Sequence, residues 1–125
     1  MPTLTRFPAK QAAAIDAVKY LGIRSGAEHR FIAVWVVVVN GRVLVRSWND
    51  KPTGWYRAFL QEPDGQIQVG ERTVRVRARK VRGERLLDAM EDAYRDKYPT
   101  PGSRIFVVGF RRARRRAATL ELLPR

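Results

Sequence analysis

The segment from Val45 to Phe59, VRSWNDKPTGWYRAF, holds two of the three tryptophans of the chain, a tyrosine and two arginines. A loop that leaves a strand and enters a helix runs over the surface and cannot fully bury large aromatic side chains. We therefore expect this segment to cover either the core or a ligand. Arginine and serine side chains bind phosphate, and aromatic side chains can wall a planar ring.

A protein whose bound flavin or deazaflavin carries the hydride needs these groups and no nucleophile of its own. The sequence thus predicts a site for FMN or a deazaflavin. An alternative for Trp55 is that it forms a core anchor with Phe59, one helical turn later. Candidate phosphate ligands are Arg46, Ser47 and Arg57; candidate ring-side residues are Trp48, Trp55 and Tyr56; Asn49 lies in the same loop, and Arg24 and Ser25 approach from the preceding turn.

The sequence contains few of the residues that hydrolytic or metal chemistry needs. There is no cysteine, which removes disulfides and thiolate catalysis, and His29 is the only histidine, so zinc is not expected. The three serines lie in no nucleophile-elbow pattern. We expect no bound metal.

Twenty-five Lys and Arg residues against twelve acidic ones give a net charge of +13, which attracts polyanions. The competing hypothesis is therefore a nucleic-acid or polyanion binder that uses the stripe Arg75, Arg77 and Arg79 and the cluster from Arg111 to Arg116. No RNP, KH or helix-turn-helix pattern supports specific recognition, and nonspecific nucleic-acid binding at low salt is expected. A partner-binding module without catalytic activity is a third hypothesis.

The elements that position these residues belong to one domain, residues 1–125, since the length matches that of a single domain. Asn40-Gly41 predicts a tight hairpin turn. The strand 72–81 alternates, with Val74, Val76 and Ala78 facing the core. The patterns predict helices at 7–21, 55–61 and 84–98 and strands at 31–39 (buried on both faces), 42–48, 66–69, 72–81, 105–110 and 118–123.

Six short strands with early hairpin pairing and three interspersed helices favour a mainly β (α+β) fold, a small six-stranded antiparallel barrel. No apolar run is long enough to span a bilayer, and the N-terminal residues lack the apolar core of a signal peptide. We expect a cytoplasmic protein with no membrane role.

The order of four segments resembles the split-barrel deazaflavin-dependent nitroreductases. The four segments of this chain are Gly22-Ile-Arg-Ser-Gly26, Asn40-Gly-Arg-Val-Leu-Val-Arg-Ser47, Gly54-Trp-Tyr-Arg57 and the strand that begins at Val76. This resemblance implies an FMN-binding split-barrel-like fold of six strands, a homodimer, and a phosphorylated cofactor near Arg46–Asn49 and Trp55–Arg57. Arg46 stands where those enzymes tend to have alanine, and Arg57-Ala58 replaces their His-Asn.

Nearly all of the chain resembles a bacterial domain-of-unknown-function family, number 2255, which brings no known activity. The resemblance is carried by Trp35-Val-Val37, Val45-Arg-Ser47, Gly54-Trp-Tyr-Arg57, the Tyr94 to Tyr98 helix segment and Ala117-Ala-Thr-Leu120.

Overall fold

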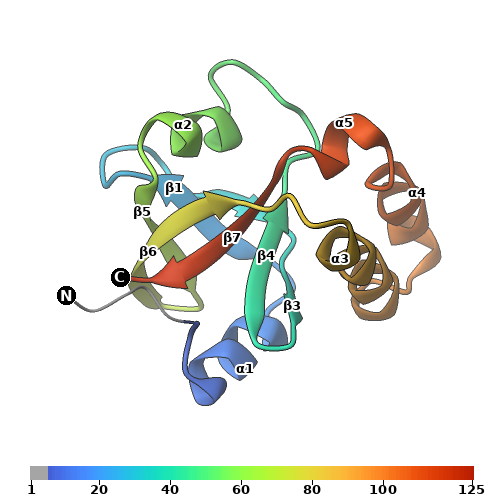
Figure 1. Cartoon of the computed structure of the whole chain (residues 1–125). Coiled ribbons are helices and arrows are strands. Elements are labelled where there is room, and N and C mark those ends of the chain that lie inside the picture. The colour runs from blue at the N-terminus through green and yellow to red at the C-terminus, as the bar shows by residue number, and fades with distance from the viewer. Residues whose placement is uncertain (1–5) are drawn as a thin grey trace.

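The computed structural model describes residues 6–125, which form one sheet of seven strands with five helices packed around it (Figure 1). The strands are β1 (Leu21–Ser25), β2 (Ile32–Val34), β3 (Val37–Val39), β4 (Arg42–Arg46), β5 (Asp64–Val69), β6 (Arg72–Lys80) and β7 (Thr119–Pro124). The helices are α1 (Ala9–Ala17), α2 (Trp55–Gln61), α3 (Glu84–Lys97), α4 (Pro101–Gly109) and α5 (Ala113–Arg116).

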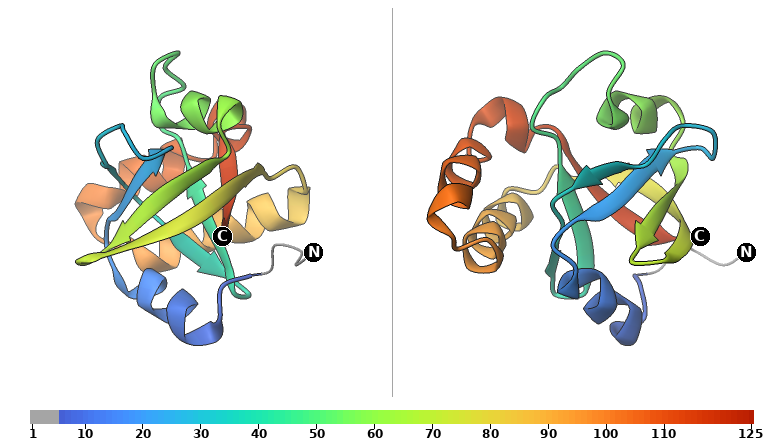
Figure 2. Two further views of the ribbon diagram at one scale, coloured as in Figure 1. Left: turned by 90° about the vertical axis from the view of Figure 1, so that its left-hand side faces the viewer. Right: turned by 180° about the vertical axis from the view of Figure 1, so that it is seen from behind.

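The sheet is antiparallel throughout and curls into a half-barrel. Its strand order is β2-β1-β5-β6-β7-β4-β3, so β2 and β3 lie at opposite edges. Only Trp35 and Val36 separate these two strands along the chain, which forces the two edges of the sheet toward each other. Figure 2 shows this curl, with α1 beneath one end of the barrel and α2 above the other.

Two cores follow from the alternation of side chains along the strands. Val43 and Val45 of β4 point into the barrel, where they pack among residues such as Ile67 and Leu122. Leu44, between them, points outward and packs with Met90 and Tyr94 of α3. Helices α3, α4 and α5 gather on this outer side of β4 (Figure 1), so the strand carries apolar residues on both faces.

Several predicted elements are confirmed. Helix α2 has the predicted bounds, α3 differs from its prediction by one residue, and β6 alternates as expected, with Val76 and Ala78 buried and its arginines exposed. Asn40 and Gly41 have φ of 51° and 78°, the positive values that the hairpin turn requires.

Three predictions about the N-terminal half are wrong. The first helix ends at Ala17 instead of reaching residue 21, and Leu21–Ser25 forms β1, because Leu21, Ile23 and Ser25 alternate toward the interior. The strand expected at 31–39 is broken into β2 and β3, since the chain crosses from one sheet edge to the other. It is not buried on both faces, because Ile32 is 42% exposed on the edge strand β2.

The strand predicted at 105–110 is wrong, because residues 105–109 form the second half of helix α4 and Phe110 is its C-cap. Thr100 caps this helix by accepting a hydrogen bond from the Ser103 amide, and Pro101 occupies its first turn. Val107 and Phe110 face the outer core, while Ile105 and Val108 remain exposed. Residues 6–125 therefore form seven strands and five helices, in place of the predicted six and three.

Candidate functional site

A cavity of about 670 Å³ opens between the first hairpin of the sheet and the loop of residues 47–54. Strands β1 and β2 with the turn between them form one wall, and the end of β4, the loop and the first turn of α2 form another; Trp35 and Phe110 complete the lining. The view from behind in Figure 2 shows the loop arching from β4 to α2 above this region. We call this space the inner cavity.

All three tryptophans of the chain line the inner cavity, and each comes from a different segment. Trp35 stacks on Tyr98 with ring centroids 4.0 Å apart, and Trp48 lies edge-on to Phe106 at 5.1 Å. Trp55 packs against the barrel core. Because these neighbours hold the indoles in place, the cavity has a preorganised aromatic lining.

The cavity is also positively charged. Its lining includes Arg24, Arg30, Arg46 and Lys51, and among residues 6–125 no aspartate or glutamate lines it. A concave surface with one sign of charge concentrates ligands of the opposite sign. The geometry therefore suits a planar aromatic ligand that carries negative charge.

Arg46 lies at the base of this cavity, but protein partners occupy its donors. Its Nε donates to Thr119 Oγ1 at 2.8 Å, and its Nη1 donates to the Phe110 carbonyl oxygen at 2.8 Å and to Glu91 Oε2 at 3.2 Å. Burial lowers the pKa of Arg46 from its ordinary value, while Tyr94 and Glu91 oppose this change. Arg46 thus joins α3 and the end of α4 to the sheet and contributes a fixed positive charge beneath the cavity.

Three more predicted residues brace the cavity wall. Arg24 donates through Nε to Gln66 Oε1 at 2.8 Å and lies over the ring of Phe31. The Ser25 hydroxyl donates to the Glu62 carbonyl oxygen at 2.7 Å, and the Ser47 hydroxyl donates to that of Asn49, also at 2.7 Å. These bonds fix the C-terminal end of α2 against β1 and set the path of the loop.

Seven of the nine predicted site residues line the inner cavity; Tyr56 and Arg57 do not. Tyr56 is buried in the barrel core and its hydroxyl donates to the Ala117 carbonyl oxygen at 3.2 Å. Arg57 points away and binds both carboxylate oxygens of Asp50, at 2.6 and 2.7 Å. This pairing raises the pKa of Arg57 and lowers that of Asp50. Cofactor binding by the nine residues stays a prediction.

Trp35, Arg30 and Lys51 also line the cavity and are not among the predicted site residues. Trp35 is the one aromatic residue within 34–39, and this interruption of the valines marks the point where the chain crosses between sheet edges. Lys51 lies inside the aromatic loop itself. Its place between Asn49 and Trp55 therefore indicates that it is near the site.

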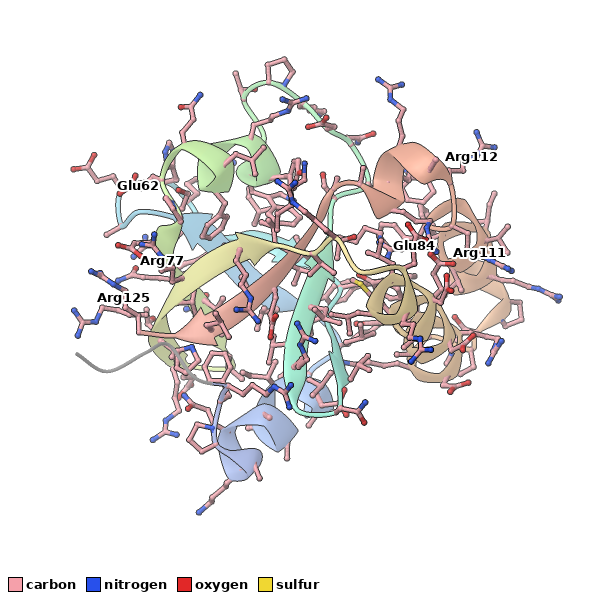
Figure 3. The ribbon with its side chains drawn as sticks, viewed as in Figure 1. Glu62, Arg77, Glu84, Arg111, Arg112 and Arg125 are labelled. Atoms are coloured by element: carbon pink, nitrogen blue, oxygen red, sulfur yellow. The ribbon has the colours of Figure 1, made fainter. Side chains whose placement is uncertain are left out.

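The arginine cluster near the C-terminus divides into two groups. Arg115 stacks over Trp48, 3.5 Å from the ring centroid, and Arg116 binds Glu84, Asp88 and Glu91. Arg111, Arg112 and Arg114 are exposed. Figure 3 shows Arg111 and Arg112 on the opposite side of the molecule from Arg77 and Arg125. Arg77 of the β6 stripe therefore lies far from the start of the C-terminal cluster.

Two further features bear on function. Across the described residues, none of the helices combines the length and the apolar character needed to cross a membrane. The same residues contain no cluster of three or more His, Cys, Asp or Glu side chains able to hold a metal ion.

Comparison with solved structures shows the fold. A conserved hypothetical protein from Mycobacterium tuberculosis, Rv2991, is 11% identical with a TM-score of 0.57, over 98% of this chain and 82% of that one. An F420-H2 dependent reductase (FDR-A) is 15% identical with a TM-score of 0.58, over 84% of this chain and 93% of that one. At these identities the similarity is one of fold.

Comparison with the curated proteins gave no match. A family model does match residues 10–122, nearly the whole chain, and its description is "Uncharacterized protein conserved in bacteria (DUF2255)". The fold shared with the F420-H2 dependent reductase agrees with the sequence resemblance to the split-barrel nitroreductases. The chain belongs to this bacterial family, DUF2255.

Proposed function

We propose that the chain is an oxidoreductase-like domain that binds FMN or a deazaflavin cofactor in the inner cavity. The observation that carries this proposal is the lining, in which all three tryptophans and four cationic side chains meet without a carboxylate among the described residues. A flavin or deazaflavin phosphate combines a planar ring with negative charge, which is the chemistry that this lining suits.

The dimensions of the cavity fit such a ligand. Small-molecule sites have volumes of roughly 300–1,000 Å³ and combine an apolar lining with a few polar groups, and the inner cavity measures about 670 Å³. Trp48 and Trp55 would cover the ring. Arg30 and Lys51, both exposed at the rim, would bind phosphate because neither has an ion pair within residues 6–125. The bound cofactor would supply hydride transfer.

The fold similarity to an F420-H2 dependent reductase supports the same proposal. The cavity residues of this chain would bind the cofactor, hold its ring between indoles and exclude water from it. Arg46 would act by its charge, since its hydrogen bonds to Thr119, Phe110 and Glu91 leave it fixed.

Titration of the purified protein with FMN and with the deazaflavin cofactor tests the proposal, with cofactor fluorescence and tryptophan quenching followed together. The double variant Arg30→Gln/Lys51→Gln removes two rim charges of the cavity. The matched control, Arg72→Gln/Arg75→Gln, removes two exposed charges from β6, which lines no part of the cavity.

Saturable binding of one cofactor per chain, weakened about tenfold or more by the rim variant alone, would support the site, since charge-assisted hydrogen bonds contribute roughly this much. No saturable binding of either cofactor, or equal weakening by both variants, would contradict it. The alternative would then be a non-catalytic polyanion-binding or partner-binding module.

A further inference from the structure

A second cavity, of about 510 Å³, adjoins the loop that bounds the inner cavity. The loop residues Ser47, Trp48, Asn49 and Lys51 line both spaces. The remaining wall of the second cavity comes from α5 and the residue before it, through Arg112, Arg114 and Arg115. We call it the outer cavity.

The charge of the outer cavity is strongly unbalanced. Four cationic side chains line it, and Asp50 is the one carboxylate in its lining among residues 6–125. Both oxygens of Asp50 already accept hydrogen bonds from Arg57. Asp50 is thus shared between Arg57 and the nearby charge of Arg114, and the lining keeps an excess of positive charge.

Arg112 and Arg114 are the residues available to a ligand. Both are exposed, and neither forms an ion pair within the described part of the chain. Arg115 is instead fixed in place: its Nε donates to the Trp48 carbonyl oxygen at 3.0 Å and its Nη1 to that of Gly109 at 3.1 Å. One immobilised guanidinium and two free ones around a concavity form a receptor for an oxyanion.

We propose that the outer cavity binds the phosphate or carboxylate group of a small-molecule ligand, with Arg112, Arg114 and Lys51 as its contacts. The site does not depend on a ring being bound in the inner cavity, because its cations other than Lys51 belong to the α5 segment. The concave shape and the small number of free cations favour a small anion over an extended nucleic acid strand, which needs a groove that tracks its backbone.

Trp48 gives this site an optical readout. Its indole contacts the Arg115 guanidinium on the outer side and also lines the inner cavity. An anion that binds beside Arg115 changes the charge next to the indole. Binding is therefore expected to alter tryptophan fluorescence.

The test is calorimetric titration of the full chain, without added cofactor, at about 0.15 M salt so that surface attraction is screened. Inorganic phosphate and pyrophosphate probe a phosphate site, and citrate probes a carboxylate site. The informative variant is Arg112→Gln/Arg114→Gln. The matched control is again Arg72→Gln/Arg75→Gln, which removes the same charge from β6 and no wall of either cavity.

We expect saturable binding of one anion per chain, weakened about tenfold or more by Arg112→Gln/Arg114→Gln and unchanged within about twofold by the control. Tighter binding of pyrophosphate would identify phosphate as the ligand group, and tighter binding of citrate would identify carboxylate. Equal weakening by both variants would overturn the proposal in favour of general surface charge. Binding of a single-stranded oligonucleotide but of none of the three anions would overturn it as well.

These outcomes are separate from those of the cofactor titration. If the unsubstituted protein binds FMN or the deazaflavin but binds none of the three anions, the outer site alone is rejected. The reverse result would reject the inner site alone.

Discussion

Gly109 of α4 lies directly against the indole of Trp48: a Cβ atom on residue 109 would lie 2.7 Å from Cζ3 of that ring. The same side chain would approach Nη1 of Arg115 to 3.2 Å. The absence of a side chain at residue 109 therefore allows the cation, the indole and the helix end to pack together between the two cavities.

The substitution Gly109→Ala is expected to push Trp48 away from α4 and to lower the free energy of unfolding by about 1–3 kcal/mol, the usual cost of overpacking. Urea unfolding and near-ultraviolet circular dichroism measure the two effects. Gly102→Ala, in the same helix, is the control, because a Cβ there meets no atom within 4 Å. It is expected to be neutral or slightly stabilising. Equal effects of both substitutions would argue against the packing described.

Replacement of Arg46 is expected to destabilise the fold. Arg46→Met leaves the carbonyl oxygen of Phe110 without its donor and removes one partner of Glu91. Loss of one partner of a buried ion pair costs about 3–5 kcal/mol, and we expect the lower end because Glu91 keeps Arg116. Denaturant unfolding measures this loss. Arg57→Met, which breaks only an exposed pair, is expected to change stability little, and a similar loss in both variants would contradict this assignment.

Glu121 is expected to make a pH-dependent contribution to the free energy of unfolding. Its side chain is fully buried on the outer face of β7 and binds Arg42 at 2.7 Å and Arg79 at 2.9 Å. Burial alone would raise the pKa of Glu121, but the hydrogen bonds from the two arginines outweigh burial and lower it. Its contribution is therefore present above the ordinary carboxyl pKa and is lost as the pH falls through the lowered value.

At neutral pH, Glu121→Gln is expected to lower the free energy of unfolding by about 1–3 kcal/mol. The difference from the unsubstituted protein should shrink as the pH is lowered from about 7 to about 3. Urea unfolding across this range measures it. A difference that stays constant with pH would show that the carboxylate charge has no part in the effect.

Ionisation of Tyr98 is expected to lower the free energy of unfolding at high pH. Its hydroxyl donates to the Lys19 carbonyl oxygen at 2.7 Å and accepts from the Val36 amide at 3.2 Å. Burial raises the pKa of Tyr98 from 10 to about 12. Between these values the unfolded chain releases a proton that the folded chain keeps, so the free energy of unfolding falls as the pH rises.

The variant Tyr98→Phe is expected to show a shallower decline across this alkaline range, because it has no hydroxyl there to ionise. Tyr94 also has a raised pKa, owing to burial, so some decline is expected to remain in the variant. Parallel unfolding titrations of the two proteins measure the difference. Identical slopes would show that Tyr98 ionises equally easily in both states.

The features predicted best are those determined by residues close together in the sequence. The turn at Asn40-Gly41 needs positive φ at both residues, and helix α2 follows Gly54 at the end of the loop. The alternation of valine and arginine determines the two faces of β6. Five of the predicted site residues that line the inner cavity, Arg46–Asn49 and Trp55, are also close in sequence.

Features set by distant pairing were not predictable in this way. Strand β1 follows α1 closely, and its burial depends on β5 and β2. The side chains of α2 also depend on helical rotation: Trp55 and Ala58 line the cavity, Tyr56 enters the core and Arg57 faces solvent. The sequence identified the helix but not which of its faces meets the cavity.

The sheet order has a consequence for how the protein folds. Strand β7 follows every other described element along the chain, yet it pairs with β6 on one side and β4 on the other, in the interior of the sheet. Until β7 is in place, β6 and β4 have no partner between them, and the half-barrel remains two separate sheets. The pairing of Arg46 with Thr119 spans most of the sequence, and such long-range pairing slows folding. We expect folding to be limited by the arrival of β7, so that a nascent chain lacking it would expose two unpaired strand edges.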